Sequence, residues 1–228
     1  MVYKTKGVCS QSIDVEVENG IVKHVQFTGG CNGNTQGVSR LIEGMDAKDI
    51  LDNGLISAMG IIGEEFKENK IFVPEMLVAA RAMTAGLQLL EPLMTETGVE
   101  PIGTVVIGTV KGDLHDIGKN LVAMMMRGMG ATVYDLGVDV PASAFIEKAE
   151  EVGADIVCLS ALLTTTMPAI GEVIEEFTKA GIRDKYYIMI GGAPVSQAFA
   201  DEVKADAYTS NASDAATVAK EYLLKKKA

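Results

Sequence analysis

The first candidates for chemistry in this chain are its two histidines, His24 and His115. His115 lies in the segment KGDLHDIGKN at residues 111–120, two positions after Asp113. One imidazole is too few for a zinc site built only from protein ligands, which needs three or four. It suffices as an extra ligand to a metal that a macrocycle already holds, and Asp113 would then fix the tautomer of His115. The alternative interpretation is a surface loop whose histidine caps the following helix, and the residues alone leave both open.

Other chemical motifs are absent from the sequence. The chain has no CxxC, no HExxH, no GxGxxG and no phosphate-binding GK[ST] after a strand. Its three cysteines, Cys9, Cys31 and Cys158, are too few and too far apart for a disulfide framework. They indicate a reducing compartment, so we expect a cytoplasmic protein.

Composition excludes several classes of protein. The chain has 228 residues, of which 48% are hydrophobic, enough for one large or two modest domains with a buried core. The net charge of −11, from 31 acidic and 20 basic residues, argues against nucleic-acid and anionic-membrane partners. The N-terminus has no apolar segment typical of a secretory signal, and no apolar run is long enough to span a bilayer.

The C-terminal half alternates short apolar runs with helical patterns. We expect strands at 104–110, 131–137, 154–160, 186–192 and 205–210. We expect helices near 118–129, 142–152, 166–181, 195–204 and 213–226. Five such repeats predict an α/β fold with a five-stranded parallel, Rossmann-like (flavodoxin-like) sheet covered on both faces. Ligands of such sheets bind beyond the carboxyl ends of the strands, where the small and polar loops KGDLHDIGKN, SALLTTT, GGAPVS and SNAS should meet.

Two smaller zones precede this domain. Residues 13–27 alternate apolar and polar around Asn19-Gly20, which predicts a hairpin, and residues 34–44 predict a short helix. Residues 1–45 therefore form a ββα unit, in which His24 is expected to face solvent. Residues 46–95 are helical, with apolar residues every three or four positions, and Pro74 begins the second helix. One stripe is Leu51, Leu55, Met59, Ile62 and Phe66, and the other is Met76, Ala80, Met83, Leu87, Leu90 and Met94.

The three loop motifs together resemble a known family. Asp113-Leu-His115-Asp116-Ile117-Gly118, then Ser160-Ala-Leu162, then Gly191-Gly192 resembles the DxHxxG, SxL, GG signature of B12-binding domains. The segment FVPEMLVAARAM resembles the helical cap that precedes this domain in corrinoid proteins of methyltransferase systems and in cobalamin-dependent methionine synthase. The resemblance covers roughly residues 46–228 and implies a cobalamin-binding α/β domain at 101–228 behind a cap at 46–95.

The resemblance also implies roles for individual residues. His115 would be the lower axial ligand of cobalt, replacing the dimethylbenzimidazole of the cofactor, with Asp113 and then Thr166 as its hydrogen-bond relay. The pair of Asp113 and His115 would take up a proton when the imidazole leaves the metal. The remaining cofactor-binding residues implied around the loops and the nucleotide tail are Gly112, Asp116, Ile117, Gly118, Ser160, Leu162, Thr164, Gly191, Gly192 and Ala212.

The function implied is that of a methyl carrier, not of a complete enzyme. Cobalamin or another corrinoid would be held base-off/His-on, and a methyl group would pass on cobalt between two partners in anaerobic one-carbon metabolism. Those partners would be a methyl-donor-specific methyltransferase and a corrinoid:tetrahydrofolate or thiol methyltransferase, with a reductive activase. The alternatives are the cobalamin subunit of a mutase, which normally lacks the cap, and a cobalamin storage or sensing module.

The N-terminal unit departs from the family pattern. The usual four-helix cap has only two good helices here, and residues 1–45 occupy the place of the first pair. These residues resemble the beginning of small TSCPD-type domains, without their cysteine-bearing end. Two interpretations are open: the unit completes the cap, or it is a docking or redox element that uses Cys9 and Cys31.

Overall fold

The computed structural model describes residues 2–4, 9–46, 49–83, 86 and 101–227. The chain divides into two compact units, Met1–Ala58 with Ala82–Glu100 and Met59–Arg81 with Pro101–Ala228. Each unit contains its own β-sheet. Within these described residues, no helix has both the length and the apolar character needed to cross a bilayer.

The first unit contains the predicted hairpin. Strands β2 (Ser10–Glu18) and β3 (Ile21–Gly29) pair antiparallel around Asn19 and Gly20, whose φ angles of 53° and 79° explain the Asn-Gly turn. Helix α1 (Asn32–Ile42) contacts β3 and begins two residues earlier than predicted. Strand β1 (Val2–Lys4), which pairs antiparallel with β2, was not predicted, because three residues are too short for an alternating pattern.

The helical zone departs from a regular helix at its start. The π-helix η1 (Ile50–Ile56) leads directly into helix α3 (Ser57–Lys67). A π-helical turn holds more residues than an α-helical turn, so the stripe predicted for one regular helix is interrupted before Met59. The second helix begins near Pro74, as predicted, and is helical over residues 73–83. Its stripe residues Met76, Ala80 and Met83 are buried, whereas Leu87, Leu90 and Met94 lie outside the described residues.

The second unit contains a five-stranded parallel sheet, which confirms the predicted fold class. Its strands are β4 (Thr104–Thr109), β5 (Thr132–Asp135), β6 (Ile156–Ser160), β7 (Tyr187–Gly191) and β8 (Ala207–Tyr208). Their order is β5-β4-β6-β7-β8 with parallel pairing throughout. All five strands lie within the predicted ranges. The central strands β4, β6 and β7 are almost continuously buried, as a sheet covered on both faces requires.

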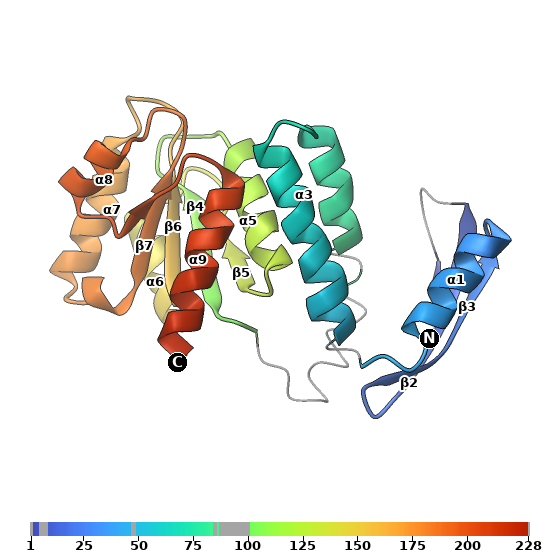
Figure 1. Cartoon of the computed structure of the whole chain (residues 1–228). Coiled ribbons are helices and arrows are strands. Elements are labelled where there is room, and N and C mark those ends of the chain that lie inside the picture. Colours follow the sequence, from blue (N-terminus) through green and yellow to red (C-terminus); the bar gives the residue numbers. More distant parts are fainter. Residues whose placement is uncertain (1, 5–8, 47–48, 84–85, 87–100, 228) are drawn as a thin grey trace. The chain divides into compact units, whose positions relative to one another are not determined.

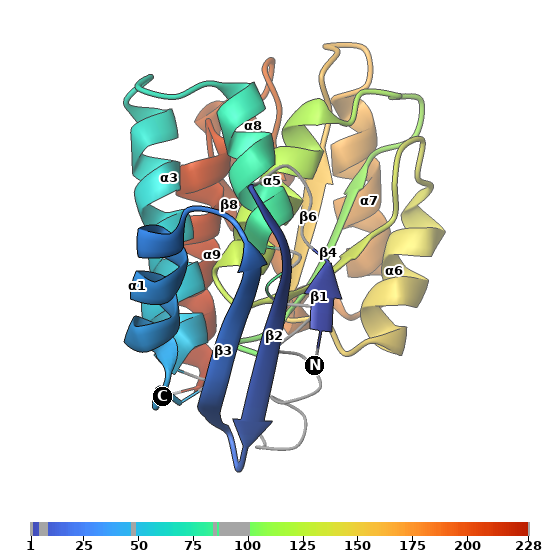
Figure 2. The same ribbon diagram turned by 90° about the vertical axis from the view of Figure 1, so that its right-hand side faces the viewer.

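Helices cover both faces of this sheet (Figures 1 and 2). They are α5 (Ile117–Gly128), α6 (Ala142–Glu151), α7 (Pro168–Lys179), α8 (Gln197–Val203) and α9 (Ala212–Lys227), with a short 3-10 turn η2 (Arg183–Lys185) before β7. Helices α5 and α9 pack together on one face, and α6, α7 and α8 cover the other. Each begins within two residues of its predicted start.

Helix α3 packs on the outer surface of α5. A Cβ added to Gly128 would lie 3.3 Å from the Met59 side chain, and one added to Gly63 would lie 2.6 Å from Met125 Cε. Glycine at these two positions therefore permits the close approach of the two helices. Because α3 packs against α5, its residue Phe66 lies at the carboxyl edge of the sheet.

The strand order places the predicted loops side by side. Strand β4 lies between β5 and β6, and Thr109 at its end is paired with Ser160 at the end of β6. The chain leaves β4 toward one face of the sheet and β6 toward the other. This is the reversal of direction at which open α/β sheets form their ligand crevice.

Candidate functional site

The loop between β4 and α5 is held at both ends by short hydrogen bonds. Thr109 Oγ1 donates to the carbonyl of His115 at 2.9 Å, and the N–H of Gly112 donates to Asp139 Oδ1 at 2.7 Å. Gly112 has φ +83°, a conformation that disfavours other residues, which gives it a backbone role in this turn. These contacts direct Asp113 inward and His115 outward.

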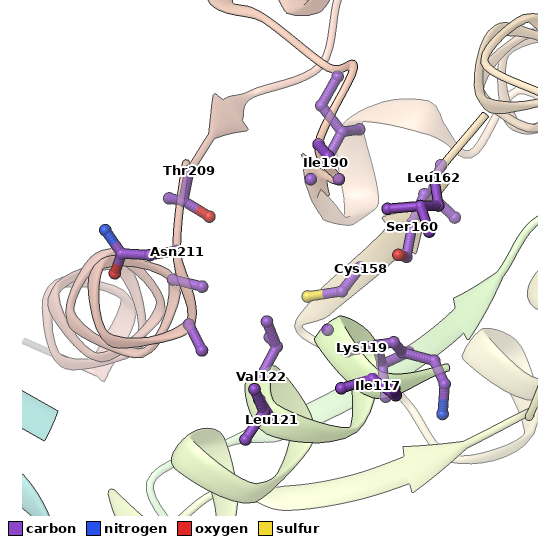
Figure 3. A pocket seen from close by; sticks show the side chains of 18 of the residues that line it. Ile117, Lys119, Leu121, Val122, Cys158, Ser160, Leu162, Ile190, Thr209 and Asn211 are labelled. Atoms are coloured by element: carbon purple, nitrogen blue, oxygen red, sulfur yellow. The ribbon is translucent and has the colours of Figure 1, made fainter. Parts of the chain in front are cut away.

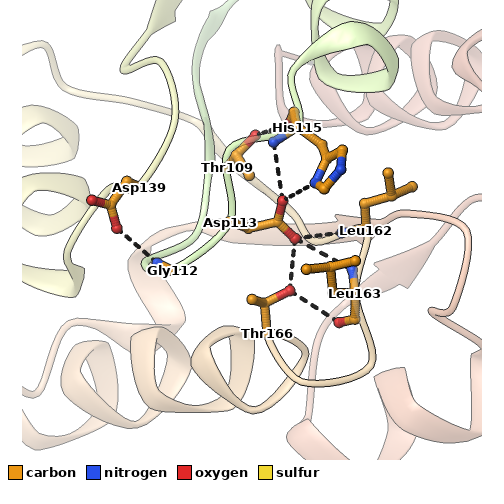
Figure 4. Close-up of polar contacts among 8 residues, drawn as sticks. All are labelled: Thr109, Gly112, Asp113, His115, Asp139, Leu162, Leu163 and Thr166. Atoms are coloured by element: carbon orange, nitrogen blue, oxygen red, sulfur yellow. Dashed lines mark hydrogen bonds and ion pairs between the residues drawn. The ribbon is translucent and has the colours of Figure 1, made fainter.

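Asp113 is the centre of a buried hydrogen-bond network (Figure 4). Its side chain has no exposed surface. One carboxylate oxygen, Oδ1, lies 2.7 Å from His115 Nδ1 and accepts the His115 backbone N–H at 3.1 Å. The other, Oδ2, accepts the Thr166 hydroxyl at 2.6 Å and the Leu162 N–H at 2.7 Å. The relay of Thr166, Asp113 and His115 that the resemblance implies is therefore assembled in the structure.

These hydrogen bonds determine the charge of Asp113. Burial alone raises the pKa of the Asp113 carboxyl. The Thr166 hydroxyl, the Leu162 N–H and both His115 groups outweigh burial and hold the pKa of Asp113 well below its usual range. An ionised Asp113 beside Nδ1 keeps the proton on that nitrogen, so the lone pair of His115 lies on Nε2.

His115 is open to a ligand on the side away from Asp113. Half of its side chain surface, 50%, is exposed, although its partner Asp113 is completely buried. Because Nδ1 faces the carboxylate, Nε2 is the nitrogen available to a metal. An imidazole that is oriented by a buried carboxylate is the arrangement typical of metal-ligating histidines.

Exposed aliphatic side chains surround this imidazole. Leu114 and Ile117 flank His115 along the chain and are 72% and 71% exposed. Leu162 and Leu163, whose N–H groups point at Asp113, are exposed as well. Four exposed aliphatic residues close to one imidazole indicate a surface that binds a large apolar group.

A cavity of about 590 Å³ opens beside His115. Figure 3 shows it between α5, the ends of β6 and β7, and the start of α9. Nine predicted residues line it: His115, Asp116, Ile117, Gly118, Ser160, Leu162, Gly191, Gly192 and Ala212. Thr166 and Asp113 lie behind His115, Gly112 lies in the preceding turn, and Thr164 is exposed on its loop without lining the cavity.

Much of the cavity wall was not predicted from the sequence. Its additional members include Phe66, Lys119, Leu121, Val122, Met126, Cys158, Met189, Ile190, Thr209 and Asn211. The helical spacing of Leu121, Val122 and Met126 looks the same for a core face as for a cavity face. Burial raises the pKa of the Cys158 thiol to about 12, as is typical of an unreactive buried thiol, although Cys158 borders the cavity.

Lys119 holds the beginning of α5 in place beside this cavity. Its ammonium lies 2.6 Å from both carboxylate oxygens of Asp135 at the end of β5, and 2.6 Å from Asn120 Oδ1. The Lys119 side chain is almost fully buried, so the charge is compensated where it would otherwise be costly.

Two glycines of the cavity wall differ in what a side chain would meet. Gly118 has no neighbouring heavy atom within 4 Å of an added Cβ, so we expect Gly118→Ala to fold. Because alanine is favoured over glycine in a helix, its free energy of unfolding should rise by about 0.5–1 kcal/mol. Gly192 has φ +136°, and its added Cβ would lie 1.8 Å from the Ala161 carbonyl oxygen. The free energy of unfolding of Gly192→Ala should therefore be lower than that of the wild type by at least about 3 kcal/mol.

Urea unfolding of the ligand-free variants measures both effects. Gly118→Ala should then weaken ligand binding in the cavity in spite of its stability, because the methyl group occupies cavity volume. Equal stability losses in the two variants would contradict the predicted difference in backbone environment.

Thr166 gives a second prediction for the ligand-free protein. Thr166→Val removes the hydroxyl that donates to Asp113 Oδ2 and leaves that buried oxygen short of a donor. We expect the free energy of unfolding to fall by about 1–2 kcal/mol in urea titrations. Thr166→Ser keeps the hydroxyl, so its free energy of unfolding should fall less than that of Thr166→Val. If the serine variant loses more than the valine variant, packing and not the hydrogen bond is the role of this side chain.

Comparison with known proteins gives the family. A model described as a B12 binding domain matches residues 103–219, and a second model with the same description matches residues 32–91. Dimethylamine corrinoid protein 1 of Methanosarcina acetivorans is 47% identical over 180 residues, covering 78% of this chain and 84% of that protein. Dimethylamine corrinoid protein 3 of Methanosarcina mazei is 51% identical over 166 residues, covering 72% of this chain and 99% of that protein.

Solved structures agree with these sequence relatives. The methanol:cobalamin methyltransferase complex of Methanosarcina barkeri matches with a TM-score of 0.71 and 32% identity, covering 84% of this chain and 72% of that chain. A cobalamin-binding protein of Desulfitobacterium hafniense matches with a TM-score of 0.67 and 31% identity, covering 77% of this chain and 82% of that chain.

The residues present fit a cobalamin. The chain offers one oriented imidazole, which is what a metal already bound in a macrocycle requires. Aliphatic side chains surround that imidazole. The cavity next to it includes open space beside Gly118, where an added Cβ would meet no atom within 4 Å. From the match of both domain models and of relatives along most of their length, the chain belongs to the cobalamin-binding corrinoid proteins of methyltransferase systems.

Proposed function

We propose that this protein carries a methyl group on the cobalt of a cobalamin, held base-off with His115 as the lower axial ligand, between partner methyltransferases. When bound, the cofactor supplies a cobalt centre that accepts and releases the methyl group. One observation carries the proposal. The buried relay of Thr166, Asp113 and His115 ends in an open imidazole at the mouth of a cavity of about 590 Å³.

Each part of the relay has a separate task. His115 binds the metal through Nε2 and is oriented by Asp113 through Nδ1. Thr166 and the Leu162 N–H keep Asp113 ionised, which makes the imidazole a stronger ligand. Uptake of a proton by this pair when the imidazole leaves the metal stays a prediction.

The cavity is proposed to hold the nucleotide tail and its displaced base. Gly118 leaves space along the first turn of α5, and Ser160 offers a hydroxyl at the end of β6. Ala212 places a small side chain at the start of α9. Gly191 and Gly192 line the same wall, where the close approach to Ala161 also requires Gly192. A role for Thr164 against the tail stays a prediction.

The partners are inferred from the relatives. Close relatives bear the name dimethylamine corrinoid protein, and a related structure is a complex with a methanol methyltransferase. A methyltransferase specific for a methylated amine is therefore the proposed donor-side partner. A tetrahydrofolate or thiol methyltransferase on the acceptor side, a reductive activase and a cytoplasmic location remain predictions. So do the domain limits of 1–45, 46–95 and 101–228.

Titration of the purified full chain with hydroxocobalamin tests the proposal. We expect one cobalamin per chain and an absorption spectrum of imidazole-ligated, base-off cofactor. The loaded protein is then incubated with a candidate methylamine methyltransferase and its amine. Methylation of the bound cofactor supports the carrier role, whereas tight binding without methyl transfer to any candidate favours storage. Absence of cobalamin binding would overturn the proposal as a whole.

A further inference from the structure

The N-terminal unit brings two cysteines together that are far apart in the sequence. Cys9 Sγ and Cys31 Sγ lie 4.0 Å apart, and both residues are exposed. Neither takes part in the corrinoid site, which belongs to the other compact unit. We propose that Cys9 and Cys31 form a redox-active dithiol site that closes to an intramolecular disulfide by thiol–disulfide exchange.

The backbone, and not chance rotamers, places the two thiols. Ser10 at the start of β2 pairs with Gly29 at the end of β3, so Cys9 lies one residue before this pair and Cys31 two residues after it. Gly30 has φ +90°, and a Cβ there would lie 3.3 Å from Ser10 N. The two chain segments therefore run in close contact where the cysteines meet.

Cys31 is held in place by hydrogen bonds from the first turn of α1, which follows it. Its carbonyl accepts the Thr35 N–H at 3.0 Å and the Thr35 hydroxyl at 3.2 Å. Cys31 is therefore held at the start of α1, and Cys9 directly precedes the first residue of β2. A disulfide requires the sulfur atoms to approach to about 2 Å, which small rotations of two exposed side chains can provide.

The surroundings of the two thiols differ. The backbone N–H of Cys31 lowers the pKa of the Cys9 thiol. The hydrogen bond with Cys9 raises the pKa of the Cys31 thiol. Because the thiolate is the nucleophile, these directions favour Cys9 as the attacking thiol, while the site itself rests on the 4.0 Å approach of the two sulfur atoms.

The reaction balances with a low-molecular-weight or protein disulfide as the oxidant. The Cys9 thiolate attacks one sulfur of that disulfide, and the other sulfur leaves as a thiolate. Cys31 then loses its proton and attacks Cys9 Sγ, which forms the Cys9–Cys31 bond and expels the second thiolate. Two thiol protons leave the protein, and two electrons reduce the oxidant to two thiols.

A metal centre is the alternative use of two neighbouring thiols. Structural zinc sites take four ligands. Among the residues that the structure describes, no group of three or more histidine, cysteine, aspartate or glutamate side chains is placed to hold a metal ion. The dithiol chemistry needs only the two residues that are present.

Redox titration of the full chain in glutathione buffers tests the inference. After acid quenching and alkylation, peptide mass spectrometry should show Cys9 and Cys31 joined within one chain, with two hydrogen atoms lost. Cys158 is the internal control, because its buried thiol should stay reduced and react only after unfolding. In the reduced protein, iodoacetamide should modify Cys9 faster than Cys31.

The variant Cys31→Ser distinguishes two thiols that react with each other from two thiols that react independently. Cys31→Ser should accumulate glutathione on Cys9 at least about tenfold more than the wild type, in which Cys31 displaces it intramolecularly. Equal glutathionylation of wild type and variant, a disulfide between two chains, or a soft metal ion retained on both thiols would each overturn the inference.

Hydrogen exchange supplies a second readout on the oxidised chain. Exchange should slow at residues 9–12 and 29–35 and stay unchanged in α5 and α9, which belong to the other unit. Unchanged exchange around both cysteines would contradict closure of a bond there. None of these measurements involves cobalamin, so their failure would leave the proposed methyl-carrier function intact.

Discussion

Replacing His115 by alanine should remove the spectrum of imidazole-ligated cobalamin and weaken cobalamin binding by about 100-fold or more. The reason is that the substitution deletes the nitrogen that binds the metal and leaves the buried carboxylate of Asp113 without its ring partner. Titration with hydroxocobalamin, followed by absorption spectroscopy, gives both the affinity and the ligand. We expect the variant to fold, because half of the His115 side chain is exposed.

His24 is the matched control for this experiment. It is the other histidine of the chain, and its Nδ1 also faces a carboxylate, Glu43 Oε1, at 3.0 Å. It lies on β3 in the N-terminal unit, so His24→Ala should bind cobalamin with the spectrum and affinity of the wild type. An unchanged spectrum in His115→Ala would reject the ligand assignment and, with it, the relay role of Asp113.

Asp113→Asn should impair both the ligand-free fold and the corrinoid site. The asparagine amide has the shape of the carboxylate, but its NH₂ group would face a donor, either the Thr166 hydroxyl and Leu162 N–H or the two His115 groups. We expect the free energy of unfolding at neutral pH to fall by about 2–3 kcal/mol. Cobalamin affinity should fall by about 10- to 100-fold, as for other partners of a metal-ligating histidine.

The pH dependence distinguishes the lost charge from lost packing. The pKa of Asp113 is lower in the folded chain than in the unfolded chain, so the folded state binds fewer protons. Its stabilisation is present above about pH 4, the ordinary value for aspartate, and is lost as the pH falls toward the folded-state value. The stability difference between wild type and Asp113→Asn should therefore shrink below about pH 4.

Asp139→Asn is the control in the same group of loops. Asp139 is exposed and accepts one hydrogen bond, from the Gly112 N–H, through an oxygen that asparagine retains. Its φ of 55° is also tolerated by asparagine. The free energy of unfolding of this variant should stay within about 0.5 kcal/mol of the wild-type value. A loss as large as that of Asp113→Asn would show that the loop responds to any change of charge.

Local patterns sufficed for most of the α/β unit. Each strand that lies between two layers of helices is a short apolar run, so its position is visible without knowledge of its neighbours. The turn at Asn19-Gly20 was predictable for a different reason, since both residues adopt positive φ angles that few other residues tolerate. By contrast, β1 has only three residues and exists through its pairing with β2, which no local pattern reveals.

The cavity shows where local patterns fail. Val122 and Met126 are four positions apart on α5, and this helical spacing is the same whether the face packs against a core or lines a cavity. Met189 and Asn211 border the same space from β7 and from the start of α9. Only the packing of these elements determines that they leave room for a ligand.

The sequence by itself determined the succession of strands and helices, the loops that carry His115 and its motif, and, through the resemblance, the cofactor. The tertiary structure decided which of these groups touch. Thr166 donates to Asp113 from 53 positions away, because β4 and β6 are neighbours in the sheet. Cys9 and Cys31 meet across 22 positions, because β2 and β3 are paired. Contacts of this kind depend on strand order and register, which are set by the burial of the whole chain and not by any one segment.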